Sequence, residues 1–158
     1  MLRPLSTFAT AWVAIMAMSM AAADDKPPRD DIARIQGNWR GVSPGNNVTM
    51  IYTFSGNNYT LLYEKPDGER LGPGIVGKFK LDETAKPHKA VDWTDSTVVA
   101  TGRNILDLPA IYAFDDDDTL KICNPLVDHP RPTEFFKSQG NFVGTVVLKR
   151  EAKRADPK

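Results

Sequence analysis

The feature that most constrains this chain is a series of short runs in which apolar and polar residues alternate, each bounded by turn-forming residues. In the run 48–55, Met50, Tyr52 and Phe54 share one face, because successive side chains of a strand point to opposite sides. The following Gly-Asn-Asn at 56–58 supplies turn chemistry, and a second alternating run covers 59–64. These two runs predict a β-hairpin with one buried face.

Further strand-like runs continue toward the C-terminus. They cover residues 74–81, 90–94, 96–101, 109–114, 119–124, 133–137 and 142–150. Ahead of the strands, Asp30 or Asp31 can cap a short helix that runs through Gln36, and Gly37 ends it. Because no long helices alternate with the strands, the pattern favours an all-β fold over parallel α/β folds. We predict a small antiparallel up-and-down barrel of about eight to ten strands with a short N-terminal helix.

The first 23 residues have the three parts of a secretory signal: basic Arg3, an apolar run over 8–20, and the small residues Ala21 to Ala23. The run is shorter than the roughly 20 apolar residues of a spanning helix, and no cysteine follows that could carry a lipid. We therefore expect cleavage after Ala23, export to the periplasm or extracellular space, and no stable membrane insertion. The remaining chain divides into a flexible leader (24–29), one barrel domain (30–151) and a charged tail (152–158).

Composition narrows the classes of partner and the means of stabilisation. The chain has 20 basic and 20 acidic residues, and this balance argues against nucleic acid, which calls for a basic surface. Cys123 is the only cysteine, so the fold has no internal disulfide. Alternation places Cys123 on the outer side of its strand with Lys121. The sequence leaves the oligomeric state open, and we expect a monomer.

The two ends of the domain carry its most distinctive pair of residues. Gly37 and Trp39 lie where the helix enters the first strand, and Arg150 lies at the end of the last strand. Arg150 shares its face with Val146 and Leu148, as does Phe142. If the apolar members point inward, the Arg150 guanidinium is predicted to lie across the Trp39 ring.

Three motifs in the C-terminal half carry a resemblance to a known family. They are Ile-Tyr-Ala-Phe at 111–114, Leu-Lys-Ile-Cys at 120–123 and Arg-Pro-Thr-Glu-Phe at 131–135; supporting matches lie at 35–39, 89–92 and 147–150. Over residues 30–150 the chain resembles the planctomycete lipocalin-like domain family of unknown function, a calycin-type group. The resemblance implies a small lipocalin-like barrel, often exported, and no established catalytic residues. The family usually has a Gly-Asp turn where this chain has four aspartates at 115–118, which leaves the type of that turn open.

Residues able to carry chemistry do not form a recognisable catalytic or metal-binding pattern. Adjacent side chains of the aspartate run splay apart, which favours a solvated turn. His88 and His129 lie beside prolines with no second ligand at metal spacing, and Ser96 and Ser138 lie outside any nucleophile elbow. We predict no catalytic residues, no metal and no cofactor.

The motif at 131–134 allows two interpretations. Arg131 and Glu134 either present a charged pair to a ligand or, as we favour, hold the loop before the penultimate strand.

Seven aromatic residues on predicted inward faces are the candidate ligand-binding residues: Tyr52, Phe54, Tyr63, Phe79, Trp93, Tyr112 and Phe114.

Two functions follow from this interior, because a barrel of eight strands is either filled by side chains or holds one small ligand. The first is an exported carrier or sensor of a small, mostly apolar molecule. The alternative is an interaction or structural module of the cell envelope, with a filled barrel and contact loops at 45–47, 65–72 and 125–132. An enzyme ranks behind both.

Overall fold

The computed structural model describes residues 30–43, 46–105, 107–126, 128–137 and 144–152. The expected signal and leader at 1–29, and the tail beyond Ala152, lie outside these residues. A single described helix, α1 (Asp31–Ile35), precedes the strands. The strands are β1 (Gly37–Val42), β2 (Thr49–Ser55), β3 (Asn58–Glu64), β4 (Ile75–Asp82), β5 (Lys89–Val98), β6 (Arg103–Asn104), β7 (Leu108–Asp116), β8 (Thr119–Asn124) and β9 (Gly144–Arg150).

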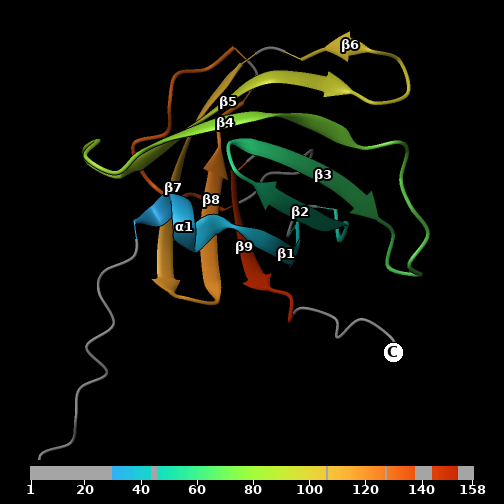
Figure 1. Cartoon of the computed structure of the whole chain (residues 1–158), viewed down its shortest axis with the longest axis horizontal. Helices are drawn as coiled ribbons and strands as arrows, with labels where there is room; N and C mark the ends of the chain where they lie inside the picture. The colour runs from blue at the N-terminus through green and yellow to red at the C-terminus, as the bar shows by residue number, and fades with distance from the viewer. Residues whose placement is uncertain (1–29, 44–45, 106, 127, 138–143, 153–158) are drawn as a thin grey trace, which may run out of the picture.

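Eight of these strands form a closed antiparallel barrel (Figure 1). The order along the sheet is β4-β3-β2-β1-β9-β8-β7-β5-β6, and an additional β4–β5 pairing closes the ring. The short β6 extends the sheet beside β5. Successive barrel strands are neighbours, and β9 returns to β1 with Trp39 opposite Arg150. The predicted all-β, up-and-down barrel is confirmed.

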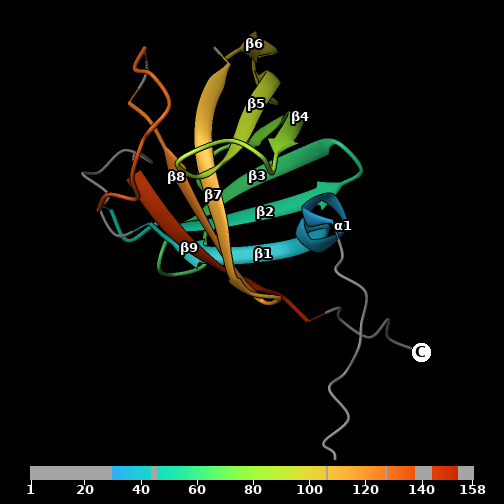
Figure 2. The ribbon, with the colours of Figure 1, turned by 90° about the vertical axis from the view of Figure 1, so that its left-hand side faces the viewer.

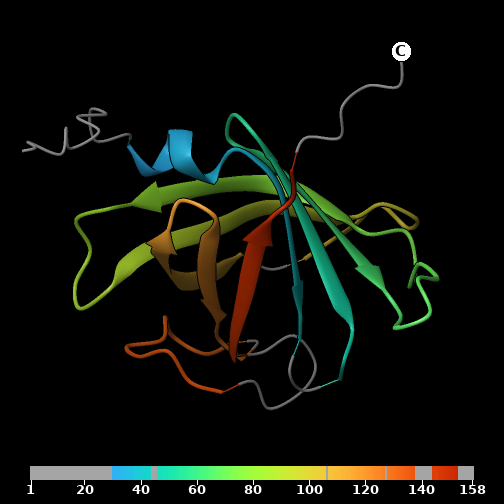
Figure 3. The same cartoon turned by 90° about the horizontal axis from the view of Figure 1, so that it is seen from below.

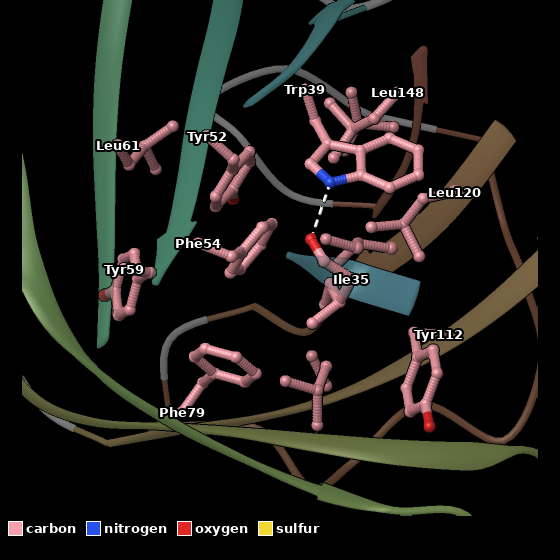
Figure 4. Close-up of a cluster of buried hydrophobic side chains, with 14 of the residues drawn as sticks. Ile35, Trp39, Tyr52, Phe54, Tyr59, Leu61, Phe79, Tyr112, Leu120 and Leu148 are labelled. Atoms are coloured by element: carbon pink, nitrogen blue, oxygen red, sulfur yellow. Dashed lines mark hydrogen bonds between the residues drawn. The ribbon is translucent and has the colours of Figure 1, made fainter. Parts of the chain in front are cut away.

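The short helix is defined by capping at its first turn. Asp30 is the N-cap, and its carboxylate accepts a hydrogen bond from the Ala33 amide at 3.0 Å. The helix ends at Ile35, one residue before the predicted end. Gly37 then has a φ of +106°, a left-handed conformation that favours glycine, and it turns the chain into β1. The Trp39 indole nitrogen donates to the Ile35 carbonyl at 2.7 Å and fastens the helix to the barrel (Figure 4).

Two predicted strand boundaries are wrong. Residues 90–94 and 96–98 belong to a single strand, β5, whose pairing with β4 shifts register near Asp95, where φ is +51°. Residues 99–101 lie in the turn that follows β5. Residues 133–137 are not a strand, apart from an isolated bridge between Lys137 and Thr145. The reason is that β9 pairs directly with β8, with Gly144 opposite Asn124, and so takes the place beside β8. Phe142, the predicted start of the last strand, lies outside the described residues.

The meander gives the barrel two distinct ends (Figures 2 and 3). At the helix end, α1 lies beside the start of β1 and the short turns 56–57 and 117–118, together with the connection 83–88. At the loop end are the described residues of four connections, which are 43, 46–48, 65–74, 99–105 (with β6), 107, 125–126 and 128–137. The described residues of the three loops predicted as contact surfaces therefore all belong to one end.

Candidate functional site

The seven candidate ligand-binding residues all belong to the barrel interior. Five are buried in the core and two, Tyr63 and Phe114, are partly buried and pack against it. The five buried members are Tyr52, Phe54, Phe79, Trp93 and Tyr112. The alternation of inward and outward residues along each strand therefore correctly predicted that these side chains face the core, because one face of each strand packs against it.

Aromatic rings pack against one another around Trp93. The centroid of the Trp93 ring lies 4.8 Å from that of Tyr59, 5.7 Å from that of Tyr52 and 6.2 Å from that of Phe54. Tyr52 and Phe54 are themselves stacked, with 3° between their planes. The labelled side chains converge from strands on opposite walls (Figure 4). The middle of the barrel is therefore occupied by packed aromatic side chains, called here the aromatic lining.

Polar groups are set among these aromatic rings. The Trp93 indole nitrogen donates to Asn124 Oδ1 at 2.9 Å, and Asn124 is the last residue of β8, on the loop side. The Tyr59 hydroxyl and Ser96 Oγ are 2.7 Å apart. Burial raises the pKa of Tyr52, and a hydrogen bond with the Asn124 side chain opposes that shift. The interior therefore combines apolar rings with buried hydrogen-bonding groups.

Neither Asn124 nor Ser96 was among the sequence-predicted interior residues. Asn124 continues the inward parity of Leu120 and Ile122, a signal that was present in the sequence. Ser96 lies three positions after inward-facing Trp93, and the irregularity at Asp95 changes the parity of the strand. Simple alternation could not place Ser96 inside.

The helix end is closed by a buried carboxylate. The Asp31 side chain is 3% exposed and accepts hydrogen bonds from Lys89 at 2.5 Å, Tyr112 at 2.9 Å and Arg34 at 3.2 Å. Burial raises the pKa of Asp31, but these three donors outweigh burial and hold the pKa below its ordinary value. Burial and the bond to Asp31 raise the pKa of the Tyr112 hydroxyl. This network ties α1 to β5 and β7.

Arg150 closes the same end from the other side. Its guanidinium carbon lies 4.1 Å from the centroid of the Trp39 ring, as parity predicts. Arg150 also donates to the carbonyls of Gln36 at 2.7 Å and Arg34 at 2.6 Å, which are the free acceptors at the end of α1. Gly37, Trp39 and Arg150 therefore fasten the helix rather than line a ligand site.

Arg131 and Glu134 lie in the segment 128–137, called here the strap, which crosses the outer side of the barrel. Arg131 pairs with Asp92 at 2.7 Å and donates to the Ala110 carbonyl at 2.5 Å. The predicted Arg131–Glu134 pairing is wrong, because Asp92 on the adjoining wall is the partner. The Glu134 carbonyl instead accepts from Cys123 Sγ at 3.8 Å. Cys123 is on the outer face, as predicted, but the strap covers it completely.

The four aspartates at 115–118 do not converge. Asp115 pairs with Lys121, Asp117 with Arg34 and Asp118 with Arg150, while Asp116 accepts from Thr119. Among the described residues, no group of three potential ligands is placed to hold a metal ion. His88 packs edge-on against Phe135 of the strap, with their ring centroids 5.0 Å apart. Ser138 lies outside the described residues.

Comparison with protein-family models, curated proteins and solved structures gives no match for this chain. The resemblance to the planctomycete lipocalin-like family therefore stays a prediction. Within the described part of the chain, no helix has the length and apolar character needed to cross a membrane.

Proposed function

We propose that the chain is an exported binding protein for a small, mostly apolar molecule that has one or two hydrogen-bonding groups. The observation that carries the proposal is the set of buried polar groups in the aromatic lining, above all the Trp93–Asn124 pair at 2.9 Å. Ligand sites in proteins typically combine an apolar lining with a few placed polar groups. The ligand would enter at the loop end, because α1 and its charged contacts close the other end.

Export supports the same role, since a binding protein outside the cytoplasm meets molecules from the surroundings. The proposal of export rests on the signal-like sequence of residues 1–23. The absence of catalytic residues, metal and cofactor stays a prediction.

The direct test is native mass spectrometry of protein purified from its own host, followed by thermal unfolding with a panel of fatty alcohols, sterols and quinones. A co-purifying mass, or a rise in Tm with ligand concentration, supports binding. Empty protein together with an unchanged Tm for every compound contradicts it.

A matched pair of variants locates the site. Ile75 is a partly buried neighbour of the core near the start of β4, and Val76 beside it is 40% exposed. Ile75→Trp should narrow the loop half of the interior and abolish the Tm shift, whereas Val76→Trp should retain it. Retention of the shift by Ile75→Trp would place the site elsewhere.

The ring-against-ring packing also favours a second candidate, an interaction or structural module of the cell envelope whose barrel is filled. Its contacts would be the predicted loops 45–47, 65–72 and 125–132. Proximity labelling in the periplasm should then recover one dominant protein, and recovery of no enriched protein would contradict this candidate.

A further inference from the structure

The orientation of the Asn124 side chain is fixed by Trp93. An indole N–H can only donate, so the amide atom 2.9 Å from Trp93 Nε1 is the oxygen, Oδ1. The amide nitrogen, Nδ2, therefore points away from Trp93 and offers its hydrogens to the other side. Asn124 is 8% exposed, which makes it the most accessible of the buried polar residues in the described part of the chain. A molecule that reaches Asn124 therefore meets hydrogen-bond donors.

The Tyr52 hydroxyl extends this set of donors. Tyr52 is stacked on Trp93, with ring centroids 5.7 Å apart, and projects into the interior from β2 (Figure 4). Burial raises the pKa of Tyr52 well above its ordinary value, so the hydroxyl keeps its hydrogen at neutral pH. The bond with the Asn124 side chain opposes this rise, which is the effect of an N–H donated to the phenol oxygen. Because that oxygen accepts from Asn124, the hydroxyl hydrogen is left for another acceptor.

A second pair of hydroxyls adds to the donors. Tyr59 Oη and Ser96 Oγ are 2.7 Å apart, and one bond between them uses the hydrogen of one hydroxyl and leaves that of the other. The pair is packed closely against Gly77, where a Cβ would lie 2.8 Å from the Tyr59 ring and 3.0 Å from Ser96 Oγ. Together with Asn124 and Tyr52, the pair has more hydrogens than carbonyl oxygens to accept them.

The charge of the interior restricts the ligand as well. In the described part of the chain, Asp31 is the one charged residue among the buried polar residues. Its carboxylate bonds to Tyr112, Lys89 and Arg34 at the helix end, away from Asn124. An ammonium or carboxylate group beside Trp93 and Asn124 would lose its hydration without gaining a charged partner, which is costly. The interior therefore favours a neutral polar group.

From this arrangement we infer that the polar group of the interior ligand is a neutral carbonyl, as in a ketone or quinone, which accepts hydrogen bonds from Asn124 Nδ2 and the Tyr52 hydroxyl. The inference rests on the proposed function and adds the chemical class of the ligand. A carbonyl offers lone pairs and brings no hydrogen of its own. An alcohol also accepts, but its own hydrogen then needs an acceptor among groups that are mainly donors.

The test compares three probes of equal chain length: decan-2-one, decan-2-ol and decan-2-amine. Dissociation constants are measured by titration, through the NMR signal of the Trp93 indole N–H, with the Trp39 indole as the internal reference. The ketone should bind at least about fivefold more tightly than the alcohol, because one donor is better satisfied. The amine, which is charged at neutral pH, should bind most weakly.

A pair of variants that each remove one hydroxyl from β2 assigns the preference to Tyr52. Tyr52→Phe should bring the affinities for ketone and alcohol within about twofold of each other, because the free donor is lost. Thr53→Val removes an exposed hydroxyl, bonded to Asn38 on the outer face, and should leave the fivefold difference unchanged. With decan-2-one labelled with ¹³C at the carbonyl, the bound signal should lie downfield of the signal in hexane and move back in Tyr52→Phe.

The results separate this inference from the proposed function. Equal affinities for ketone and alcohol, tightest binding of the amine, or an undiminished ketone preference in Tyr52→Phe would each overturn the carbonyl assignment. Each of these results leaves the proposed function standing, because a ligand still binds in the interior. Absence of binding by all three probes and by the wider panel would contradict the proposed function itself, and the inference with it.

Discussion

At the helix end of the barrel, a five-residue helix is fixed by a buried carboxylate and by a guanidinium lying on an indole. At the loop end, long connections surround the side of the aromatic interior where Trp93 bonds to Asn124, the last residue of β8. Ion pairs and backbone capping therefore close the helix end, whereas at the loop end a hydrogen-bonding side chain, Asn124, lies at the last position of its strand. The two ends are therefore built differently, and we propose that the helix end contributes most to stability and that a ligand enters at the loop end.

The largest effect should come from removing the anchor of the helix. Trp39→Ala is expected to lower the free energy of unfolding by about 3–5 kcal/mol, because a fully buried ring and its bond to Ile35 are both lost. Urea denaturation followed by circular dichroism measures this change. Val42→Ala, on an exposed position of the same strand, should cost less than about 0.5 kcal/mol. Similar losses in both variants would show that the helix end is not the stabilising end.

The next largest loss of stability should come from removing the charge of the buried Asp31 carboxylate, and the size of this loss should depend on pH. Asp31→Asn is expected to lower the free energy of unfolding by about 2 kcal/mol. This loss is smaller than is usual when a buried ion pair is broken, because the partner Lys89 is 40% exposed. Since the pKa of Asp31 is lowered by folding, its contribution is present at neutral pH and is lost as pH falls below the unfolded value of about 3.9.

Denaturation curves at several pH values separate these effects. The difference between parent and Asp31→Asn should shrink as pH falls below about 4, while the exposed control Asp107→Asn should match the parent throughout. A difference that stays constant with pH would mean that the charge of Asp31 contributes nothing.

The strap offers a test on the outer wall. Arg131→Gln should remove the ion pair with Asp92 and lower the free energy needed to detach the strap from the barrel by about 1.4 kcal/mol. This change corresponds to about a tenfold rise in the fraction of molecules whose strap is detached. The rate at which Cys123 reacts with a thiol reagent should rise by the same factor. Arg103→Gln, on exposed β6, is the matched control. An unchanged rate in Arg131→Gln would show that Arg131 does not hold the strap.

The smallest effect concerns the buried pair of hydroxyls, Tyr59 and Ser96. Tyr59→Phe and Ser96→Ala should each cost about 1 kcal/mol, and the double variant should cost little more, because both single changes remove the same hydrogen bond. A double-mutant cycle in urea measures this coupling. Additive losses would mean that the two hydroxyls act independently and would weaken the assignment of a preorganised interior.

The predictions that succeeded share a local origin. Alternation placed Tyr52, Phe54 and Trp93 inside, because each strand has a core side and an outer side. The same parity brought Arg150 over Trp39 once the first and last strands were taken as neighbours.

The predictions that failed depend on which distant segments meet. Arg131 pairs with Asp92, 39 positions away in the chain, and no local period encodes that distance. Cys123 is on the outer face and yet buried, because a later segment crosses over it. The irregularity at Asp95 likewise moved Ser96 inward, which strict alternation cannot anticipate.

The most direct test asks which end a bound molecule reaches. Residues 24–158 contain two tryptophans, Trp39 at the helix end and Trp93 in the aromatic lining, so Trp39→Phe and Trp93→Phe each leave one reporter. The neutral contact quencher 12-bromododecan-1-ol should saturably quench the fluorescence of Trp93 in the first variant and leave Trp39 in the second unaffected. Quenching of Trp39 alone, equal quenching of both, or no quenching of either would contradict a binding site that opens at the loop end.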